Sequence, residues 1–150
     1  VGYNYRLSNV CAGIGRGQME VLEQRVLQRI ENHHFYKEIL TKFVGVKLFS
    51  EPNNDFKSNH WLNAILINPK DTDGIDRENL RLAFDEVNIE SRPLWKPMHM
   101  QPIFEKAEFF GSNIAENLFN NGLCLPSGSN LSEQDKKRIQ VILEKMFISK

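Results

Sequence analysis

The segment from Arg92 to Pro102 (RPLWKPMHMQP), here called the proline loop, constrains the fold most, because three of its eleven residues are prolines. Proline fixes φ and has no backbone N–H, so this density of prolines excludes a regular helix and a central strand. Each proline also drives the residue before it toward extended geometry. The sequence therefore predicts a stiff, extended loop, and such loops often hold groups that contact ligands.

Four side chains of the proline loop suit an anionic, partly planar ligand. Arg92 and Lys96 can contact phosphate, the guanidinium as a fork and the ammonium as a point charge. Trp95 offers a flat apolar face, and His99 can donate, accept or carry a charge near neutral pH. A nucleotide would fit all four. The alternative is a surface loop in which Trp95 fills a gap in the core and the cations are solvated.

Length and composition indicate one domain without a strongly charged surface. The chain has 150 residues, enough to bury a core, and its 19 basic residues balance 19 acidic ones. Binders of nucleic acid or of membrane surfaces need a basic excess, so neither partner is expected. Cys11 and Cys124 do not make a disulfide framework, which favours a cytoplasmic protein. No apolar run reaches the ~18 residues of a membrane-spanning helix.

The stretch from Gln18 to Phe43 contains neither proline nor glycine and carries apolar residues at helical spacing. It predicts one long amphipathic helix, bent or broken near Gly15–Gly17. The glycines just before it do not form the G-x-G-x-x-G phosphate loop. Gly13 and Gly17 share one helical face, and we interpret them as a place where another backbone packs closely.

His33 and His34 lie side by side in this helix. Adjacent residues point about 100° apart on a helix, so the two side chains are a poor pair of ligands for one metal ion. We therefore predict no metal site in the chain and place both histidines on a solvated face.

The remainder of the chain alternates between short strands and helices. Strands are expected at 46–49, 61–67, 89–92 and 123–126. Helices are expected at 76–87, after Ser112 as N-cap, and after Ser132, whose hydroxyl would form a capping box with Asp135. This order predicts one compact α+β unit behind a long helix.

Three segments in this order carry a family resemblance: GYNYRLSN at 2–9, RPLWKPMH at 92–99 and GLCLPSG at 122–128. Together they resemble the C-terminal part of the DegT/DnrJ/EryC1/StrS nucleotide-sugar aminotransferases, and the resemblance covers nearly the whole chain. It implies the small domain of a fold type I aminotransferase, with a long linking helix before a short antiparallel sheet flanked by helices. Residues 1–45 would be the interdomain segment and long helix, and residues 46–150 the small C-terminal α+β domain.

The resemblance also implies a pyridoxal 5'-phosphate (PLP) enzyme that works as a homodimer, with its sites at the dimer interface. In such enzymes the asparagine of the first segment bonds the cofactor phosphate in the partner's active site. This role carries over to Asn4, with Tyr5 and Arg6 as further cofactor-binding candidates. Without the family, Asn4 would be interpreted as a turn or cap residue.

The proline loop corresponds to a part of the family that contributes to the nucleotide-sugar pocket. This role carries over to His99, and as further candidates to Trp95, Lys96 and Arg92. The physical argument from the residues agrees, because two cations and a ring suit a diphosphate and a base or sugar face.

The implied reaction aminates C4 of a UDP- or GDP-linked 4-keto-6-deoxy sugar, for surface polysaccharides or glycans. An amino donor such as glutamate would supply the amine in a first half-reaction, and the sugar would receive it in a second. The Schiff-base lysine, the acidic partner of the pyridinium nitrogen and the phosphate cradle lie in the family's large N-terminal domain. Because this chain starts at the first segment, we expect that domain to be absent, assign no catalytic residue, and expect the fragment to be inactive and free of PLP.

Two interpretations from other classes were weighed against the enzyme. A non-catalytic nucleotide-binding or dimerisation module is compatible with the proline loop and the long helix, and the sequence upstream of Val1 would discriminate between it and the enzyme. A small α+β RNA-binding domain is disfavoured, because the charge is balanced and the strands lack interleaved basic and aromatic residues.

Overall fold

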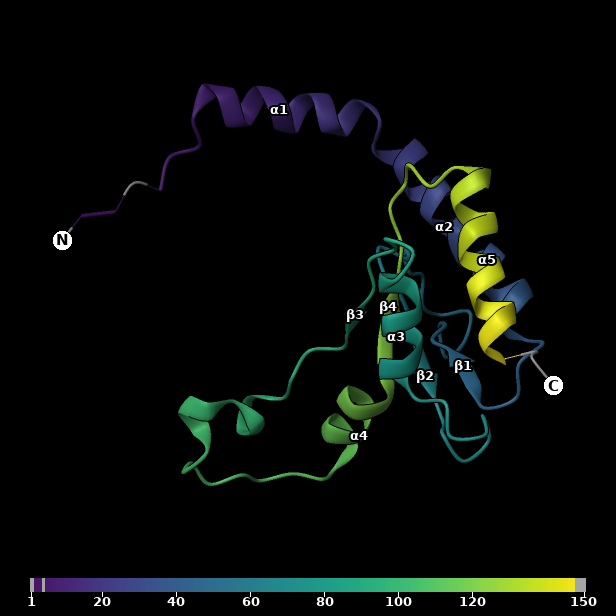
Figure 1. The fold of residues 1–150 in the computed structure, drawn as a ribbon. Coiled ribbons are helices and arrows are strands. Elements are labelled where there is room, and N and C mark those ends of the chain that lie inside the picture. Colours follow the sequence, from purple (N-terminus) through teal and green to yellow (C-terminus); the bar gives the residue numbers. More distant parts are fainter. Residues whose placement is uncertain (1, 4, 148–150) are drawn as a thin grey trace.

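The protein is built on a four-stranded antiparallel sheet, with helices packed on it and one helix that stands apart (Figure 1). The computed structural model describes residues 2–3 and 5–147. Its α-helices are α1 (Asn9–Glu20), α2 (Leu22–Leu40), α3 (Arg77–Asp85), α4 (Ile114–Asn121) and α5 (Glu133–Phe147). Its strands are β1 (Val46–Leu48), β2 (Asn63–Ile67), β3 (Arg92–Pro93) and β4 (Gly122–Leu125). Two short 3-10 helices are η1 (Met98–Met100) and η2 (Pro102–Phe104). The predicted α+β architecture is confirmed.

The sheet has the strand order β1-β2-β4-β3, and each neighbouring pair is antiparallel. The central strand β4 is buried along its whole length. Strand β3 is shorter than the predicted strand at 89–92, because the backbone there still completes the exit from α3. Asn88 has a φ of 56°, and the Ile89 N–H donates to the Phe84 carbonyl at 2.9 Å. Strand β3 lies at the edge of the sheet. Pro93 has no N–H to donate, and at an edge this removes no hydrogen bond from the centre of the sheet.

The hydrophobic core lies between one face of the sheet and the helices α2, α3 and α5. Strands β2 and β4 supply alternate residues to this face, as the two-residue period of a strand requires. Tyr36 of α2 is fully buried, and its hydroxyl donates to the Pro126 carbonyl at 2.8 Å. Burial raises the pKa of this phenol above its usual range. Helix α2 is therefore tied to the end of β4 by both packing and a hydrogen bond.

The predicted long helix is in fact two helices, and the predicted position of its break is wrong. Helix α1 passes through the glycines without interruption, and the chain bends at Val21, with φ −115° and ψ 6°. The buried residues of the pair all lie on α2, so the bend falls where the chain meets the body of the protein. A Cβ on Gly13 or Gly17 would meet no atom within 4 Å. The close packing predicted for these glycines is therefore not formed within the described chain.

The two cap predictions have different outcomes. Ser132 and Asp135 form the predicted capping box before α5: the Ser132 N–H donates to Asp135 Oδ2 at 3.0 Å, and the Asp135 N–H donates to Ser132 Oγ at 3.2 Å. Ser112 does not cap α4. Asn113 occupies the N-cap position, and its side chain makes no cap hydrogen bond. Helix α4 therefore begins without the side-chain cap that its sequence suggested.

The junction between α4 and β4 is tighter than the predicted turn at 120–122. The helix runs to Asn121, and the strand begins at the next residue, Gly122. A Cβ on Gly122 would collide with the side chain of Leu94 and with the carbonyl oxygen of Leu118. Glycine is therefore required here by close approach, and it lets the proline loop pass directly over the start of β4.

None of the helices in the described part of the chain combines the length and the apolar character that crossing a bilayer requires.

Candidate functional site

The proline loop leaves the sheet edge as β3 and reaches α4 by way of η1 and η2. Its first part is fixed to the sheet, because the Leu94 N–H donates to the Gly122 carbonyl at 3.3 Å. Farther along, the Gln101 side-chain amide donates to the Lys96 carbonyl at 3.1 Å. The prediction of an extended loop without a central strand holds for its first part, but the loop turns into the 3-10 helix η1 from Met98, so it is not extended throughout. Hydrogen bonds hold the extended part at both ends.

His99 is held in a defined orientation between two side chains that the sequence analysis missed. Its Nε2 lies 2.9 Å from Oε1 of Glu116, on the first turn of α4. Its ring stacks on Phe109, with the centroids 3.8 Å apart and the planes at 29°. When Nε2 carries the hydrogen, it donates to Glu116 and leaves Nδ1 as an acceptor. The sequence could have suggested Glu116, which is the only acidic residue of the α4 first turn.

Trp95 and Lys96 point away from the body of the protein. The Trp95 side chain is 69% exposed, so the alternative in which it fills a core gap is wrong for the described chain. A second tryptophan, Trp61, lies beside it and is 59% exposed, with ring centroids 6.4 Å apart and planes at 35°. Lys96 is exposed directly after Trp95. The two indoles form an open aromatic surface that suits a planar ligand, and an exposed lysine follows Trp95 in the sequence.

Arg92 lies at the start of the proline loop, in the edge strand β3, and is bound to a carboxylate. Its Nε and Nη2 lie 2.7 and 2.5 Å from Oε1 of Glu90. Both side chains are mostly exposed, so water screens this pair and its stability contribution is small. A phosphate could therefore replace Glu90 at modest cost.

The N-terminal candidates lie far from the proline loop within this chain. Asn4 lies outside the described residues. Tyr5 is 90% exposed, with its ring 6.1 Å from that of Tyr3, and Arg6 is also exposed. Figure 1 shows this segment at the free end of α1, well apart from strand β3, where the proline loop begins. The structure therefore does not bring the two predicted sets of site residues together in one chain.

The prediction that both adjacent histidines of α2 are solvated is wrong for His33 and right for His34. His33 is 4% exposed, because it lies on the face of α2 that packs against the sheet. Its Nδ1 lies 2.9 Å from Asn63 Oδ1, and its Nε2 lies 3.2 Å from Ser50 Oγ. His34 is exposed. Asn63 and Ser50, the polar partners of His33, are distant from it in the sequence. The residues near His33 in the chain therefore gave no indication that it is buried.

His33, Glu51 and His60 form the one metal-type group found among the described residues, with ligand atoms within 4.8 Å of one another. The two imidazoles are stacked, with centroids 3.8 Å apart and planes at 17°. An ion must lie close to the plane of each ring it binds, and two nearly parallel rings offer no such common point. His60 instead pairs with Glu51 at 3.1 Å. Burial lowers the pKa of His60, and the neighbouring His33 adds to this effect.

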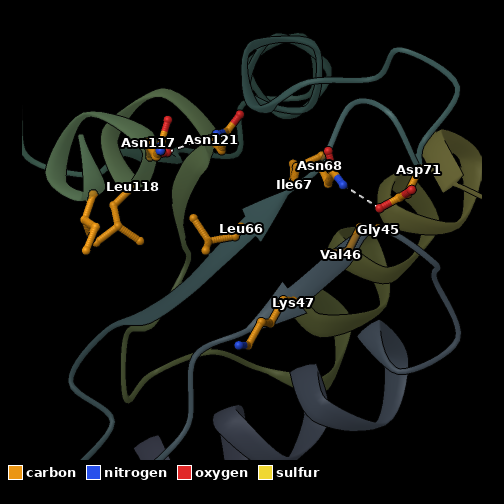
Figure 2. A pocket seen from close by; sticks show the side chains of 11 residues that line it. Gly45, Val46, Lys47, Leu66, Ile67, Asn68, Asp71, Asn117, Leu118 and Asn121 are labelled. Carbon is orange, nitrogen blue, oxygen red and sulfur yellow. Dashed lines mark hydrogen bonds between the residues drawn. The ribbon is translucent and has the colours of Figure 1, made fainter. Parts of the chain in front are cut away.

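A separate cavity of about 540 Å³ lies between the outer face of the sheet and α4 (Figure 2). Leu66 of β2 and Leu118 of α4 line two of its sides, and Lys47 of β1 lies at its edge. The Asn68 amide donates to Asp71 at 2.5 Å on the opposite rim. Its size suits a small ligand, but the lining is largely apolar, and within the described chain it includes no residue of the proline loop. We therefore place the candidate functional site on the proline loop.

The sequence of this chain matches known proteins of one family. The sequence model of the DegT/DnrJ/EryC1/StrS aminotransferase family matches residues 1–144. EpsN of Bacillus subtilis strain 168, named as a pyridoxal phosphate-dependent aminotransferase, is 39% identical over 98% of this chain and 38% of its own length. GDP-perosamine synthase of Escherichia coli O157:H7 is 31% identical over 89% of this chain and 35% of its own length. The chain thus spans less than two fifths of these two relatives.

Solved structures agree on the fold. Helicobacter pylori PseC, an aminotransferase involved in the biosynthesis of pseudoaminic acid, superposes with a TM-score of 0.83 at 20% identity, over 100% of this chain and 40% of PseC. DesI, crystallised with its TDP-sugar product, gives a TM-score of 0.85 at 21% identity, over 96% of this chain and 36% of DesI. At these identities the likeness supports the fold alone, which is that of one part of a larger aminotransferase. With a family match that extends over nearly all its residues, the chain belongs to the DegT/DnrJ/EryC1/StrS aminotransferase family.

Proposed function

We propose that the whole natural protein is a PLP-dependent aminotransferase that aminates a nucleotide-linked 4-keto-6-deoxy sugar. Residues 1–45 would serve as its interdomain segment and residues 46–150 as its small C-terminal domain. The observation that carries this proposal is the family match over residues 1–144. Relatives from three bacteria are named GDP-perosamine synthase, at 28% to 31% identity, which favours a sugar nucleotide as substrate and polysaccharide or glycan biosynthesis as the setting.

The chemistry of the N-terminal segment fits a role in holding the cofactor phosphate. A phenol and a guanidinium, from Tyr5 and Arg6, donate hydrogen bonds to phosphate, and both side chains are exposed on an extended segment. They do not form a closed cradle, so with Asn4 they would complete a phosphate site that another surface provides. PLP, when bound there, supplies the electron sink that lets an amino group pass from donor to acceptor. With no catalytic lysine assigned to it, this chain alone would be inactive.

A homodimer would explain why the two sets of site residues lie apart. The N-terminal segment stands beyond α1, and α1 itself buries none of its residues. In a symmetric pair, each N-terminal segment could reach the partner's cofactor while the proline loop serves the substrate. An amino donor such as glutamate would use the same cofactor in the first half-reaction.

The proline loop would bind and orient the sugar nucleotide. Lys96 and Arg92 would neutralise the diphosphate, with Arg92 exchanging Glu90 for a phosphate oxygen. Trp95 would lie against a base or sugar face. His99 would accept a hydrogen bond from a sugar hydroxyl, or donate one to a keto oxygen when the facing ring nitrogen carries a hydrogen. Glu116 would be a positioning residue that holds the imidazole in one orientation.

The variant His99→Ala in the whole, PLP-loaded protein tests this assignment. We expect kcat/KM for a UDP- or GDP-linked 4-keto-6-deoxy sugar to fall by roughly 10²-fold, as for the loss of a positioned polar group, while PLP retention and the amino-donor half-reaction are unchanged. His34→Ala is the matched control, because His34 is an exposed histidine on α2. Equal activity of the His99→Ala and His34→Ala variants would remove His99 from the site.

The alternative is a non-catalytic nucleotide-binding or dimerisation module. It is favoured by the apolar residues that α1 leaves exposed, among them Val10 and Ile14 at 72% and 61%. A whole protein that dimerises and binds a nucleoside diphosphate, but neither retains PLP nor transfers an amino group, would support the module and contradict the enzyme.

A further inference from the structure

Trp61 and Trp95, the two tryptophans of the chain, meet outside the hydrophobic core. Large aromatic side chains usually bury most of their area, yet these two are 59% and 69% exposed. Their rings are 6.4 Å apart, although Trp61 lies just before β2 and Trp95 lies just after β3. An exposed pair of this kind is typical of a binding surface.

The backbone at Trp61 is anchored by the body of the protein. Arg29 of α2 donates from Nη1 to the Trp61 carbonyl at 2.5 Å and to the Ser127 carbonyl at 3.1 Å. The Trp61 N–H donates to Asn59 Oδ1 at 3.2 Å. A guanidinium that bridges two loop carbonyls fixes their relative position, so the exposed indole projects from a rigid base.

The residue before Trp61 adopts a backbone conformation that is unfavourable for a non-glycine residue. His60 has a φ of 47°, in the left-handed region. Its stack on the buried His33 and its contact with Glu51 hold it there. Strained residues persist only where the surrounding structure imposes them, and they cluster at functional sites. Here the strain directs the chain so that Trp61 faces solvent beside Trp95.

Trp95, the second tryptophan of the surface, is also held by hydrogen bonds of its neighbours, and a lysine follows it in the chain. Leu94 is hydrogen-bonded to β4, and the Lys96 carbonyl accepts from Gln101, so Trp95 lies between two fixed residues. The Lys96 side chain is exposed next to it. An aromatic surface with an exposed lysine at the next position of the chain is compatible with a nucleobase and its attached phosphates, because a base stacks on rings while a cation attracts phosphate.

We propose that Trp61 and Trp95 together form the surface on which the base of a nucleoside diphosphate stacks, with Lys96 meeting its phosphates. This assignment rests on the proposed function for its ligand class, and it adds Trp61, which lies outside the proline loop. Stacking on indole is tolerant of base identity, so the surface would contribute affinity for UDP, GDP and TDP sugars alike, and selectivity among them would lie elsewhere.

Calorimetric titration of the whole, PLP-loaded protein with UDP, GDP and inorganic pyrophosphate tests this surface. Loss of one aromatic stacking partner weakens binding by about five- to hundredfold, so Trp61→Ala should raise the Kd for both nucleotides by that factor. The Kd for pyrophosphate should stay within about twofold, since stacking requires a base. Trp61→Phe keeps a ring and should retain most of the affinity. Phe56→Ala is the matched control, because Phe56 is also 59% exposed and lies in the same loop.

Several results would overturn the proposal. One is an unchanged nucleotide Kd in Trp61→Ala, and another is an equal loss for pyrophosphate, which would indicate a general structural effect. A third is a wild-type protein that binds neither nucleotide, and a fourth is a Trp61→Ala variant that loses its partner subunit but keeps its nucleotide Kd.

The amination assay tests the proposed enzyme separately from the stacking surface. A protein that binds nucleotides through Trp61 but aminates no sugar would contradict the proposed enzyme and leave the stacking surface in place.

Discussion

The body of the protein and its two projecting parts differ in where their partners lie. Helices α2, α3 and α5 cover one face of the sheet, and their apolar side chains find their contacts within the chain. Helix α1 buries nothing, and the proline loop exposes Trp95 and Lys96. Burial in the body thus follows from this chain alone, whereas the projecting parts leave apolar and charged groups exposed, which we propose are contacted by a partner subunit and a ligand. Substitutions in the body should change stability, and those in the projecting parts should change binding.

The largest effect is expected in the body. Phe84→Ala removes a side chain of α3 that is 0% exposed, and deletion of a buried phenyl ring costs about 3–5 kcal/mol of unfolding free energy. Urea unfolding followed by circular dichroism measures the loss. Phe110→Ala, at a ring that is 87% exposed, should change stability by less than ~0.5 kcal/mol. If the two variants lose similar amounts of unfolding free energy, the body and the projecting parts do not differ in their contribution to stability.

A smaller, pH-dependent effect is expected at the base of the tryptophan surface. His60 has a folded-state pKa below its usual 6.5, because burial and the nearby His33 and His34 outweigh the attraction of Glu51. The unfolded chain therefore binds this proton more readily. The stability that neutral His60 contributes is present above pH 6.5 and is lost as the pH falls through the folded pKa.

Unfolding free energies measured between pH 8 and pH 5 test this dependence. The wild-type protein should lose stability more steeply below pH 6.5 than His60→Asn, since asparagine does not titrate and tolerates the left-handed backbone. Parallel curves for the two proteins would mean that His60 is not the group responsible.

The smallest effect on stability is expected in α1, where the sign of the change shows whether the helix packs within its own chain. Outside the backbone of its own helix, no atom of the described residues lies within 4 Å of a Cβ built on Gly17, so Gly17→Ala should stabilise the helix by about 0.5–1 kcal/mol through its higher helix propensity. If α1 packs closely against a second copy in the dimer, the same change should weaken self-association. Thermal unfolding and analytical ultracentrifugation measure the two quantities. A destabilised monomer would show that α1 packs within its own chain.

Local signals predicted much of the fold. The capping box of Ser132 and Asp135 and the apolar strand that became β2 depend on neighbouring residues, so their patterns are visible in the sequence. The predicted cap at Ser112 failed, because the chain enters α4 one residue later, at Asn113. The site was predicted less completely: Glu116 and Trp61 were missed, since each contacts the proline loop from a segment distant in sequence.

Patterns within single segments were enough to predict the α+β class, the extended first part of the proline loop, and the segments that carry the family resemblance. These follow from the fixed φ of proline, the period of apolar residues and short-range hydrogen bonds. Three features depend on packing between segments: the bend at Val21, the burial of His33 beside a solvated His34, and the contact of Trp61 with Trp95. Each of these depends on which face of one segment packs against another, and a pattern within a single segment does not contain that information.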